Sequence, residues 1–264
     1  ELKGHVPSPG WDARYDWAGW LEPTLTPREI DPPRGWIATA NQRIHAADYP
    51  PYITNEWALP YRQQRIEQLL SATQRHSLES LAAIQADEKS LAAEPLLQQL
   101  RKARSEHPLA AQALKELSAF DGTMSADRAA PLILWAWTRQ VTQALLADEL
   151  GGDLYQRVIG SPSFPPAGGG NLPRGDIFWC DDKTTPDVAE SCQERVDTAF
   201  TRTLDELQET QGSDLAKWRW GDAHQARSEH RPFSRVRGLA SLFELRTPVG
   251  GDTYTVNVSR VSLK

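Results

Sequence analysis

Hydrophobic side chains recur every three or four positions from about residue 59 onward, and this spacing predicts that helices form the middle of the chain. The longest predicted helix covers about 126–150 and ends at Gly151-Gly152. Another is predicted to start after Thr185 as N-cap, with Pro186 as its first residue. The hydrophobic positions that define these two helices are Trp137, Val141, Leu145, Val188, Cys192, Val196, Phe200, Leu204 and Leu207.

Two shorter stretches favour β-strands instead. Residues 36–42 follow the turn residue Gly35 and are largely apolar and β-prone, and residues 253–258 alternate β-branched with other side chains. Because these strands are short and the predicted helices are long, we expect an α+β fold that is predominantly helical.

The chain is expected to form a single fragment, 1–264, built from four consecutive segments. These are an extended Pro- and Trp-rich segment with the first strand (1–58), a helical region (59–150), a Gly- and Pro-rich loop (151–186), and a helix, loop and returning strand (187–264). Trp11, Trp17 and Trp20 lie in the extended segment. Since a buried indole removes a large apolar area from water, we expect these tryptophans to anchor the segment by packing.

Composition disfavours several classes of partner. Lys plus Arg total 29 against 35 Asp plus Glu, a formal charge of −6 without any long basic block, so nucleic acid and anionic membranes are not expected partners. No stretch approaches the roughly 20 apolar residues that cross a bilayer. The first residues show no signal-peptide pattern, so a signal for export would have to lie upstream of Glu1.

Two cysteines, Cys180 and Cys192, flank a short turn-rich segment. We expect them to form a disulfide, with two unrelated small residues as the plainer alternative. Metal binding is less favoured, because no nearby His or further Cys completes a set of four ligands. His224 and His230 are six positions apart, which does not place both on one helix face. A polar surface helix with satisfied imidazoles is therefore expected there, and not a metal pair.

Candidate chemistry lies at the end of the first predicted strand. Asn41 and Gln42 follow Ala38-Thr-Ala40, so the strand would hold a primary amide rigidly where the chain opens into a loop. Such an amide is well placed to donate hydrogen bonds. The pattern alone equally permits a plainer role, in which Asn41 only ends the strand and caps a turn.

Several short motifs follow one another in a characteristic order. Around the candidate amide they are Ala38-Thr-Ala-Asn41-Gln42, Asp48-Tyr-Pro50, Trp57 and Tyr61-Arg-Gln-Gln-Arg-Ile66. Asp16-Trp-Ala-Gly19 and Gly250-Gly-Asp-Thr-Tyr-Thr-Val-Asn257 lie farther away. In this order and spacing the motifs resemble the penicillin acylase family, over almost the whole chain.

The resemblance implies a partial N-terminal-nucleophile hydrolase fold, from the late portion of the family's second (β) chain. In this family autocatalytic cleavage frees an N-terminal Ser that is both nucleophile and base, because its α-amine, with a pKa of about 7.7–8.0, accepts the hydroxyl proton. Glu1 does not match that Ser, so we expect this chain to lack the nucleophile and to be inactive alone. Its expected partners are the α chain and the N-terminal part of the β chain of the same acylase.

Two residues of the implied site fall within this chain. Asn41 matches the family Asn whose side-chain amide, with an upstream backbone N–H, stabilises the oxyanion. Arg62 matches an Arg that steadies this Asn, although from the pattern alone it is an ordinary charge at a helix start. No cofactor is expected. Ile53 stands near the position of an expected Asp ligand of the family's structural calcium, and an aliphatic side chain cannot ligate a hard cation.

The resemblance implies hydrolysis of the amide bond in N-acylated small molecules, such as β-lactam antibiotics or acyl-homoserine lactones. The alternative is a non-catalytic helical binding or scaffold module of the same ancestry. A hydrolase that uses paired carboxylates is disfavoured, because no convincing pair lies in an apolar setting. The family and the cysteine pair together predict a periplasmic or secreted bacterial protein.

Overall fold

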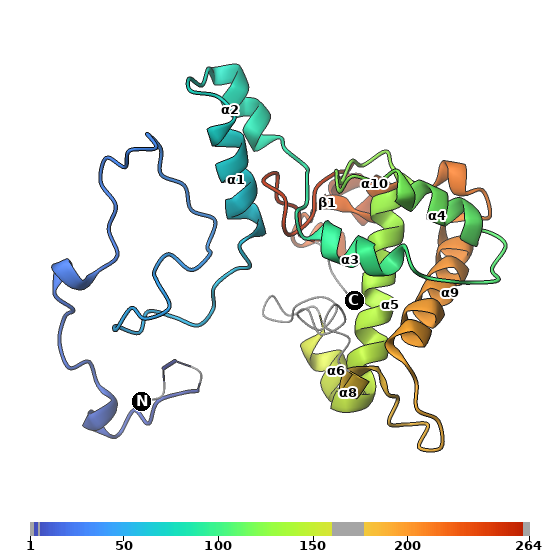
Figure 1. Ribbon diagram of the computed structural model, residues 1–264, viewed down its shortest axis with the longest axis horizontal. Coiled ribbons are helices and arrows are strands. Elements are labelled where there is room, and N and C mark those ends of the chain that lie inside the picture. Colours follow the sequence, from blue (N-terminus) through green and yellow to red (C-terminus); the bar gives the residue numbers. More distant parts are fainter. Residues whose placement is uncertain (1–2, 5, 160–176, 261–264) are drawn as a thin grey trace. The chain divides into compact units, whose positions relative to one another are not determined.

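The computed structural model describes residues 3–4, 6–159 and 177–260 (Figure 1). Residues 160–176 of the predicted Gly- and Pro-rich loop therefore lie outside the described residues. The chain divides into two compact units, unit 1 (Glu1–Arg75) and unit 2 (His76–Lys264). Helices dominate the described residues, which contain a single two-stranded sheet. The predicted α+β, predominantly helical class is confirmed.

Unit 1 is mostly irregular chain followed by helix α1 (Tyr61–Ser71) (Figure 1). Repeated prolines limit the regular structure before α1 to the short 3₁₀ turns Ala13–Tyr15 and Pro23–Leu25. Among the described residues of this unit only Ala40 and Gln63 are buried, so unit 1 has almost no core of its own.

The N-terminal tryptophans differ from expectation. Trp11, Trp17 and Trp20 are 89%, 91% and 96% exposed, so they do not anchor the segment against other described parts of the chain. The 3₁₀ turns beside these tryptophans contain no buried residue. No described element therefore covers the indole rings.

Neither predicted strand forms within the described residues, because a strand requires a neighbouring strand with which to pair. In 36–42, the Gln63 and Arg62 side chains donate to the Ala38 and Ala40 carbonyls at 2.9 Å each, in place of a partner strand. In 253–258, the Thr255 hydroxyl closes a turn by donating to the backbone carbonyl of Asn257 at 2.7 Å. Both strand predictions are wrong for this chain.

Unit 2 is built around α5 (Ala129–Leu150), whose buried residues occupy much of its circumference. Its core contains Trp137, Val141 and Leu145, as the hydrophobic spacing predicts. The α-helices that contact α5 include α3 (Ala93–Leu100), α4 (Ala110–Ser118), α6 (Gly152–Val158), α8 (Ile177–Cys180), α9 (Cys192–Gln211) and α10 (Trp220–Ala223). Among these, α9 packs on α5 most extensively. A further helix, α2 (Leu78–Gln85), precedes this bundle.

Helix α9 begins later than predicted. Ser191, and not Thr185, is its N-cap, and it forms a capping box with Glu194. Residues before Ser191 form turns instead, and Val188 is 57% exposed. A capping box satisfies two free backbone donors at once, which is why Ser191 sets the start of the helix and not the Thr-Pro pair.

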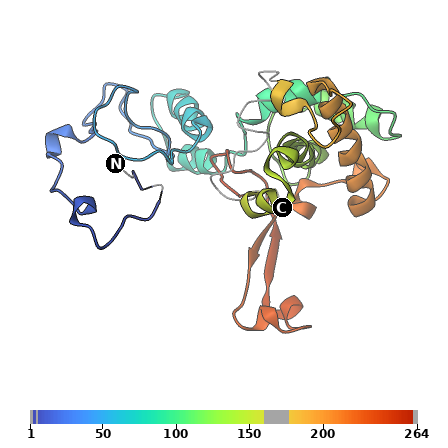
Figure 2. The same ribbon diagram turned by 90° about the horizontal axis from the view of Figure 1, so that it is seen from below.

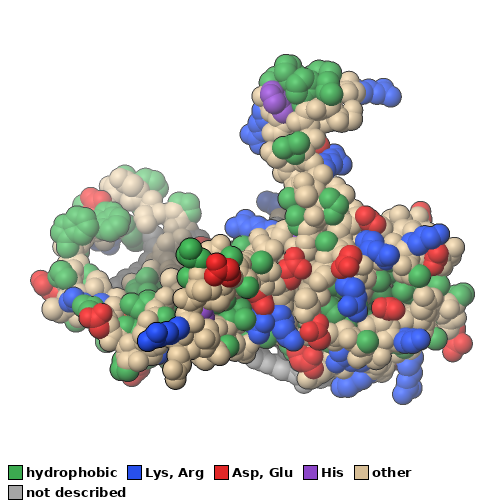
Figure 3. Space-filling view, turned by 90° about the horizontal axis from the view of Figure 1, so that it is seen from above, with side chains coloured by type: hydrophobic (Ala, Val, Ile, Leu, Met, Phe, Trp, Pro, Cys, Tyr) green, Lys and Arg blue, Asp and Glu red, His purple; other side chains and the backbone are tan. Residues whose placement is uncertain are grey.

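The only sheet among the described residues is a hairpin that sequence patterning did not predict. Strands β1 (Gln225–Ser228) and β2 (Leu245–Pro248) are antiparallel and extend away from the helices of unit 2 (Figure 2). Hydrophobic side chains gather at its far end (Figure 3), where the short helix α11 (Ala240–Phe243) lies. The strands are polar and exposed, so they lack the hydrophobic alternation by which a strand is recognised.

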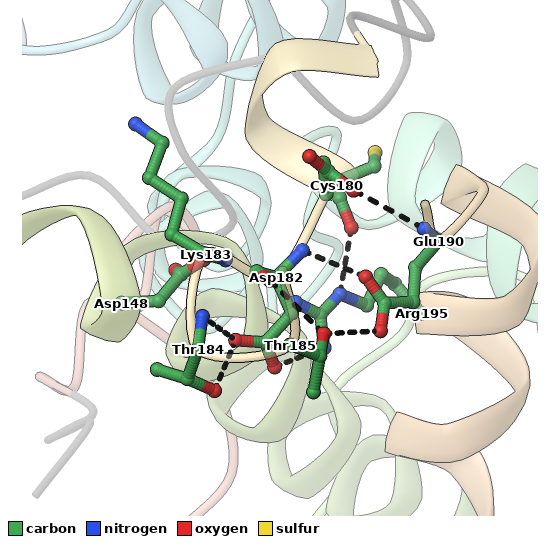
Figure 4. A network of polar contacts seen from close by, with 9 residues as sticks. Asp148, Cys180, Asp182, Lys183, Thr184, Thr185, Glu190 and Arg195 are labelled. Carbon is green, nitrogen blue, oxygen red and sulfur yellow. Dashed lines mark hydrogen bonds and ion pairs between the residues drawn. The ribbon is translucent and has the colours of Figure 1, made fainter. Parts of the chain in front are cut away.

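The predicted disulfide is confirmed. Cys180, at the end of α8, and Cys192, at the start of α9, are bonded with a Cα–Cα distance of 4.9 Å. The loop that they close is also held by Arg195, which donates to the Cys180 carbonyl at 2.7 Å and to Asp182 at 3.0 Å (Figure 4). None of the described helices is long and apolar enough to cross a bilayer.

Candidate functional site

The two residues that the sequence singled out lie in contact within unit 1. Arg62, in the first turn of α1, donates from Nη2 to Asn41 Oδ1 at 3.0 Å and to the Ala40 carbonyl at 2.9 Å. Arg62 is half-buried and Asn41 is exposed. One guanidinium nitrogen therefore holds both the side chain of Asn41 and the backbone that precedes it.

This contact determines which end of the Asn41 amide is available. A guanidinium has donors and no acceptor, so the amide atom that faces Arg62 must be the oxygen. The Nδ2 group then points away from Arg62, and no described residue accepts a hydrogen bond from it. The exposed part of Asn41 is consequently a hydrogen-bond donor.

The backbone of Asn41 is also unusual. Its φ is +66°, in the left-handed region that Asn tolerates better than most residues with a side chain. Its carbonyl accepts from Ala58 N–H at 2.8 Å, which closes the loop between these residues. Just before it, Ala40 N–H donates to Gln42 Oε1 at 2.8 Å. Contacts on both sides thus hold Asn41 in this conformation.

Gln63 is a site residue that sequence reasoning missed. It is 6% exposed, and its Nε2 donates to the Ala38 carbonyl and to Glu67 Oε1, at 2.9 Å in both cases. It therefore ties α1 to the same stretch that Arg62 holds. The available signal was its spacing of four from Glu67, which places both polar side chains on one face of the helix.

An aromatic cluster lies in the loop that follows Asn41. The His45 ring is 4.7 Å from the Tyr49 ring and 5.4 Å from the Trp57 ring, measured between centroids. Tyr49 and Trp57 both belong to the motifs described above. All three rings are half-buried, and their contacts join separate parts of the loop between Asn41 and Ala58.

Other candidate residues do not join this site. In the part of the chain that the structure describes, no group of three or more His, Cys, Asp or Glu side chains could hold a metal ion. Ile53 is exposed. His224 is buried at the end of α10, stacked on Trp220, so it does not lie on a surface helix. Burial lowers the pKa of His224.

Asp252 is a buried carboxylate of unit 2. It is 1% exposed, and burial raises its pKa to about 6. Its Oδ1 accepts from Tyr254 N–H at 2.6 Å, a contact that favours the charged form but does not outweigh desolvation. Asp252 belongs to the Gly250–Asn257 motif, so this motif builds a buried turn in place of the predicted strand.

Comparison with known proteins identifies the family. A family model described as penicillin amidase matches residues 1–264. The chain belongs to the penicillin amidase family. Members of the family are amide hydrolases, which agrees with a site that presents a fixed hydrogen-bond donor.

Curated relatives of this penicillin amidase family chain include two kinds of acylase. The acyl-homoserine lactone acylase QuiP of Pseudomonas putida is 33% identical over 281 residues, covering 97% of this chain and 33% of that protein. Penicillin acylase 2 proenzyme of a Pseudomonas species is 30% identical over 259 residues, covering 96% and 32%. The chain therefore spans about a third of the length of these relatives.

A solved structure supports the fold of this family member. Thermostable penicillin G acylase from Alcaligenes faecalis matches with a TM-score of 0.55 and 18% identity. The match covers 89% of this chain and 47% of that chain. At this identity the similarity concerns the fold alone.

Proposed function

We propose that this chain is part of an acylase that hydrolyses the amide bond of N-acylated small molecules, with acyl-homoserine lactones or β-lactam antibiotics as substrates. The names of its relatives support this substrate class. The observation that carries the proposal is the contact of Arg62 with Asn41 Oδ1, because it leaves Nδ2 free to donate. The disulfide and the family support a periplasmic or secreted location.

Asn41 would act when the scissile carbonyl becomes tetrahedral. Negative charge then gathers on the carbonyl oxygen, and a donor already aimed at that position stabilises it without reorganising. Arg62 would act as a positioning residue, since its guanidinium donates to the oxygen of the Asn41 amide and would affect the reaction through that amide. The nucleophile is assigned to the N-terminal Ser that the family resemblance implies, in other segments of the same acylase.

The test is substitution of Asn41 in the full-length enzyme. Asn41→Gly removes the amide but keeps a residue that accepts the positive φ, and Asn41→Ala removes the amide with added backbone strain. We expect kcat to fall about a hundredfold or more in both variants, with substrate binding much less affected. Asn41→Asp is expected to be worse, because it places an acceptor against the developing charge.

Asn55→Ala is the matched control. Asn55 is an exposed amide in the same unit, and its Oδ1 accepts from the Tyr52 hydroxyl at 2.7 Å. We expect kcat to be unchanged in this variant. If Asn41→Gly keeps near-normal kcat in a folded and processed enzyme, Asn41 only terminates the extended stretch and the catalytic assignment fails.

A further inference from the structure

Gln63 holds the chain before Asn41 at a second point, two residues from the contact made by Arg62. Gln63 Nε2 donates to the Ala38 carbonyl at 2.9 Å, and Arg62 donates to the Ala40 carbonyl at 2.9 Å. Both side chains come from the first turn of α1. One contact alone would let the chain turn about it, whereas two contacts fix its direction relative to α1. That direction in turn sets where the Asn41 amide points.

The orientation of the Gln63 amide is determined by its neighbours. A primary amide has two N–H donors, and Nε2 donates to the Ala38 carbonyl and to Glu67 Oε1, at 2.9 Å in both cases. A carbonyl and an ionised carboxylate can only accept, so a rotated amide would turn its oxygen toward two other oxygens. Glu67, one turn farther along α1, therefore fixes the rotamer of Gln63.

The other end of the Gln63 amide does not explain why a polar side chain is buried here. Gln63 is 6% exposed, and its Oε1 has no hydrogen-bond partner among the described residues. A buried polar atom without a partner is unfavourable, so an apolar side chain of similar size would serve folding as well. What distinguishes glutamine at this position is therefore the pair of contacts that its Nε2 makes.

We propose that Gln63, held by Glu67, is a second positioning residue of the oxyanion donor Asn41. It fixes the direction of the preceding chain, so that Asn41 Nδ2 is already aimed where negative charge develops. The proposal rests on the proposed function, because it takes Asn41 as the oxyanion donor. A donor aimed in the wrong direction loses transition-state stabilisation while substrate binding is largely kept, so the effect of Gln63 is expected in kcat and not in KM.

Gln63→Leu in the full-length enzyme tests the proposal. Leucine keeps a buried side chain of similar size and removes both donors, so the variant is expected to fold. We expect kcat to fall about tenfold and KM to change less than about twofold. In an Asn41→Gly background the same substitution should change kcat less than about twofold, because the group that it positions is absent. Gln64→Leu, at the next and exposed position of α1, is the matched control and should leave kcat unchanged.

Gln63→Glu provides a second test through pH. Burial and the Glu67 carboxylate should raise the pKa of the introduced carboxyl above its ordinary value of about 4.3. The protonated carboxyl can donate to the Ala38 carbonyl, whereas the ionised carboxylate can only repel it. The ratio of variant to wild-type kcat is therefore expected to fall at least about fivefold between about pH 5.5 and about pH 8. Circular dichroism at both pH values checks that the variant is folded.

Three results would each overturn the proposal. They are an unchanged kcat in Gln63→Leu, an equal loss of kcat in the Asn41→Gly background, and a kcat ratio for Gln63→Glu that does not vary with pH.

Hydrogen exchange separates this proposal from the proposed function without turnover. The Ala58 amide donates to the Asn41 carbonyl at 2.8 Å, so its exchange reports how firmly Asn41 is held. Mass spectrometry is expected to show this amide exchanging at least about fivefold faster in Gln63→Leu. Faster exchange together with an active Asn41→Gly variant would refute the catalytic role of Asn41 and not the contact that holds it. Unchanged exchange and kcat in Gln63→Leu, with an inactive Asn41→Gly variant, would refute the positioning role of Gln63 alone.

Discussion

Asn41 shows how a neighbouring residue selects which end of an amide is exposed. Arg62 can only donate, so it binds the oxygen and turns the donor outward. The same guanidinium nitrogen binds the Ala40 carbonyl, which ties the rotamer of Asn41 to its own backbone. The effect of Arg62 on kcat should therefore depend on the presence of Asn41.

A double-mutant cycle measures that dependence. Arg62→Ala frees the amide to rotate, and we expect kcat of the full-length enzyme to fall about tenfold with little change in substrate binding. In an Asn41→Gly background the same change should have much less effect on kcat, because the group that it positions is gone. Equal losses in the two backgrounds would show that Arg62 acts independently of Asn41.

Asp252 provides a prediction about stability and pH. Burial raises its pKa from 3.8 to about 6, so the folded state holds the proton more tightly than the unfolded state. The stabilisation of the folded state by protonated Asp252 is complete below about pH 4 and is lost as pH rises through about 6. The loss is about 3 kcal/mol of unfolding free energy.

Urea unfolding at about pH 4 and about pH 7 checks this sign. Asp252→Asn cannot titrate but can still accept from Tyr254 N–H. We expect the wild-type chain to lose about 2 kcal/mol more than Asp252→Asn between these two pH values, because the unfolded carboxyl is already partly ionised at about pH 4. An equal pH dependence in the two proteins would show that the carboxyl titrates at its ordinary pKa.

At the scale of elements, the sequence predicted helices better than strands. The position of α5 follows from its hydrophobic spacing, because local periodicity carries that information. Strand pairing depends on partners distant in the sequence. The prediction of strands at 36–42 and 253–258 is therefore wrong, and the hairpin β1–β2 was not predicted.

The candidate site was only partly predictable for the same reason. Asn41 and Arg62 came from motif order and spacing, and the structure places them in contact. Gln63 was missed because its burial depends on how α1 lies against the extended stretch. That packing is tertiary, and no local pattern reports it.

The disulfide between α8 and α9 gives an element-scale prediction. It closes a short loop, with a sequence separation of 12, so reduction should lower the unfolding free energy by about 2–3 kcal/mol through greater freedom of the unfolded chain. Denaturant unfolding with and without reductant measures this. The Cys180→Ala/Cys192→Ala variant is the control, in which reductant should have no effect. A wild-type midpoint insensitive to complete reduction would contradict the prediction.

At the scale of the whole molecule, the two units differ in how they are stabilised. The hydrophobic core runs from Ala93 to Trp220 and lies wholly in unit 2. Unit 1 buries only Ala40 and Gln63 among its described residues. Since burial of apolar surface is the main favourable contribution to folding, unit 1 should open far more readily than unit 2 when the chain is alone.

Limited trypsin digestion of the 264-residue chain tests this difference. Arg75 is exposed between α1 and α2, and Arg28 and Arg34 lie in the irregular part of unit 1. We expect peptides from residues 1–75 to be released at least about tenfold faster than peptides from α5 and α9, because cleavage follows local opening. In the full-length acylase the same sites should be cut more slowly if other segments cover unit 1. Equal release from both units of the isolated chain would show that unit 1 is as stable as the helical core, and that its few buried residues are sufficient to hold it.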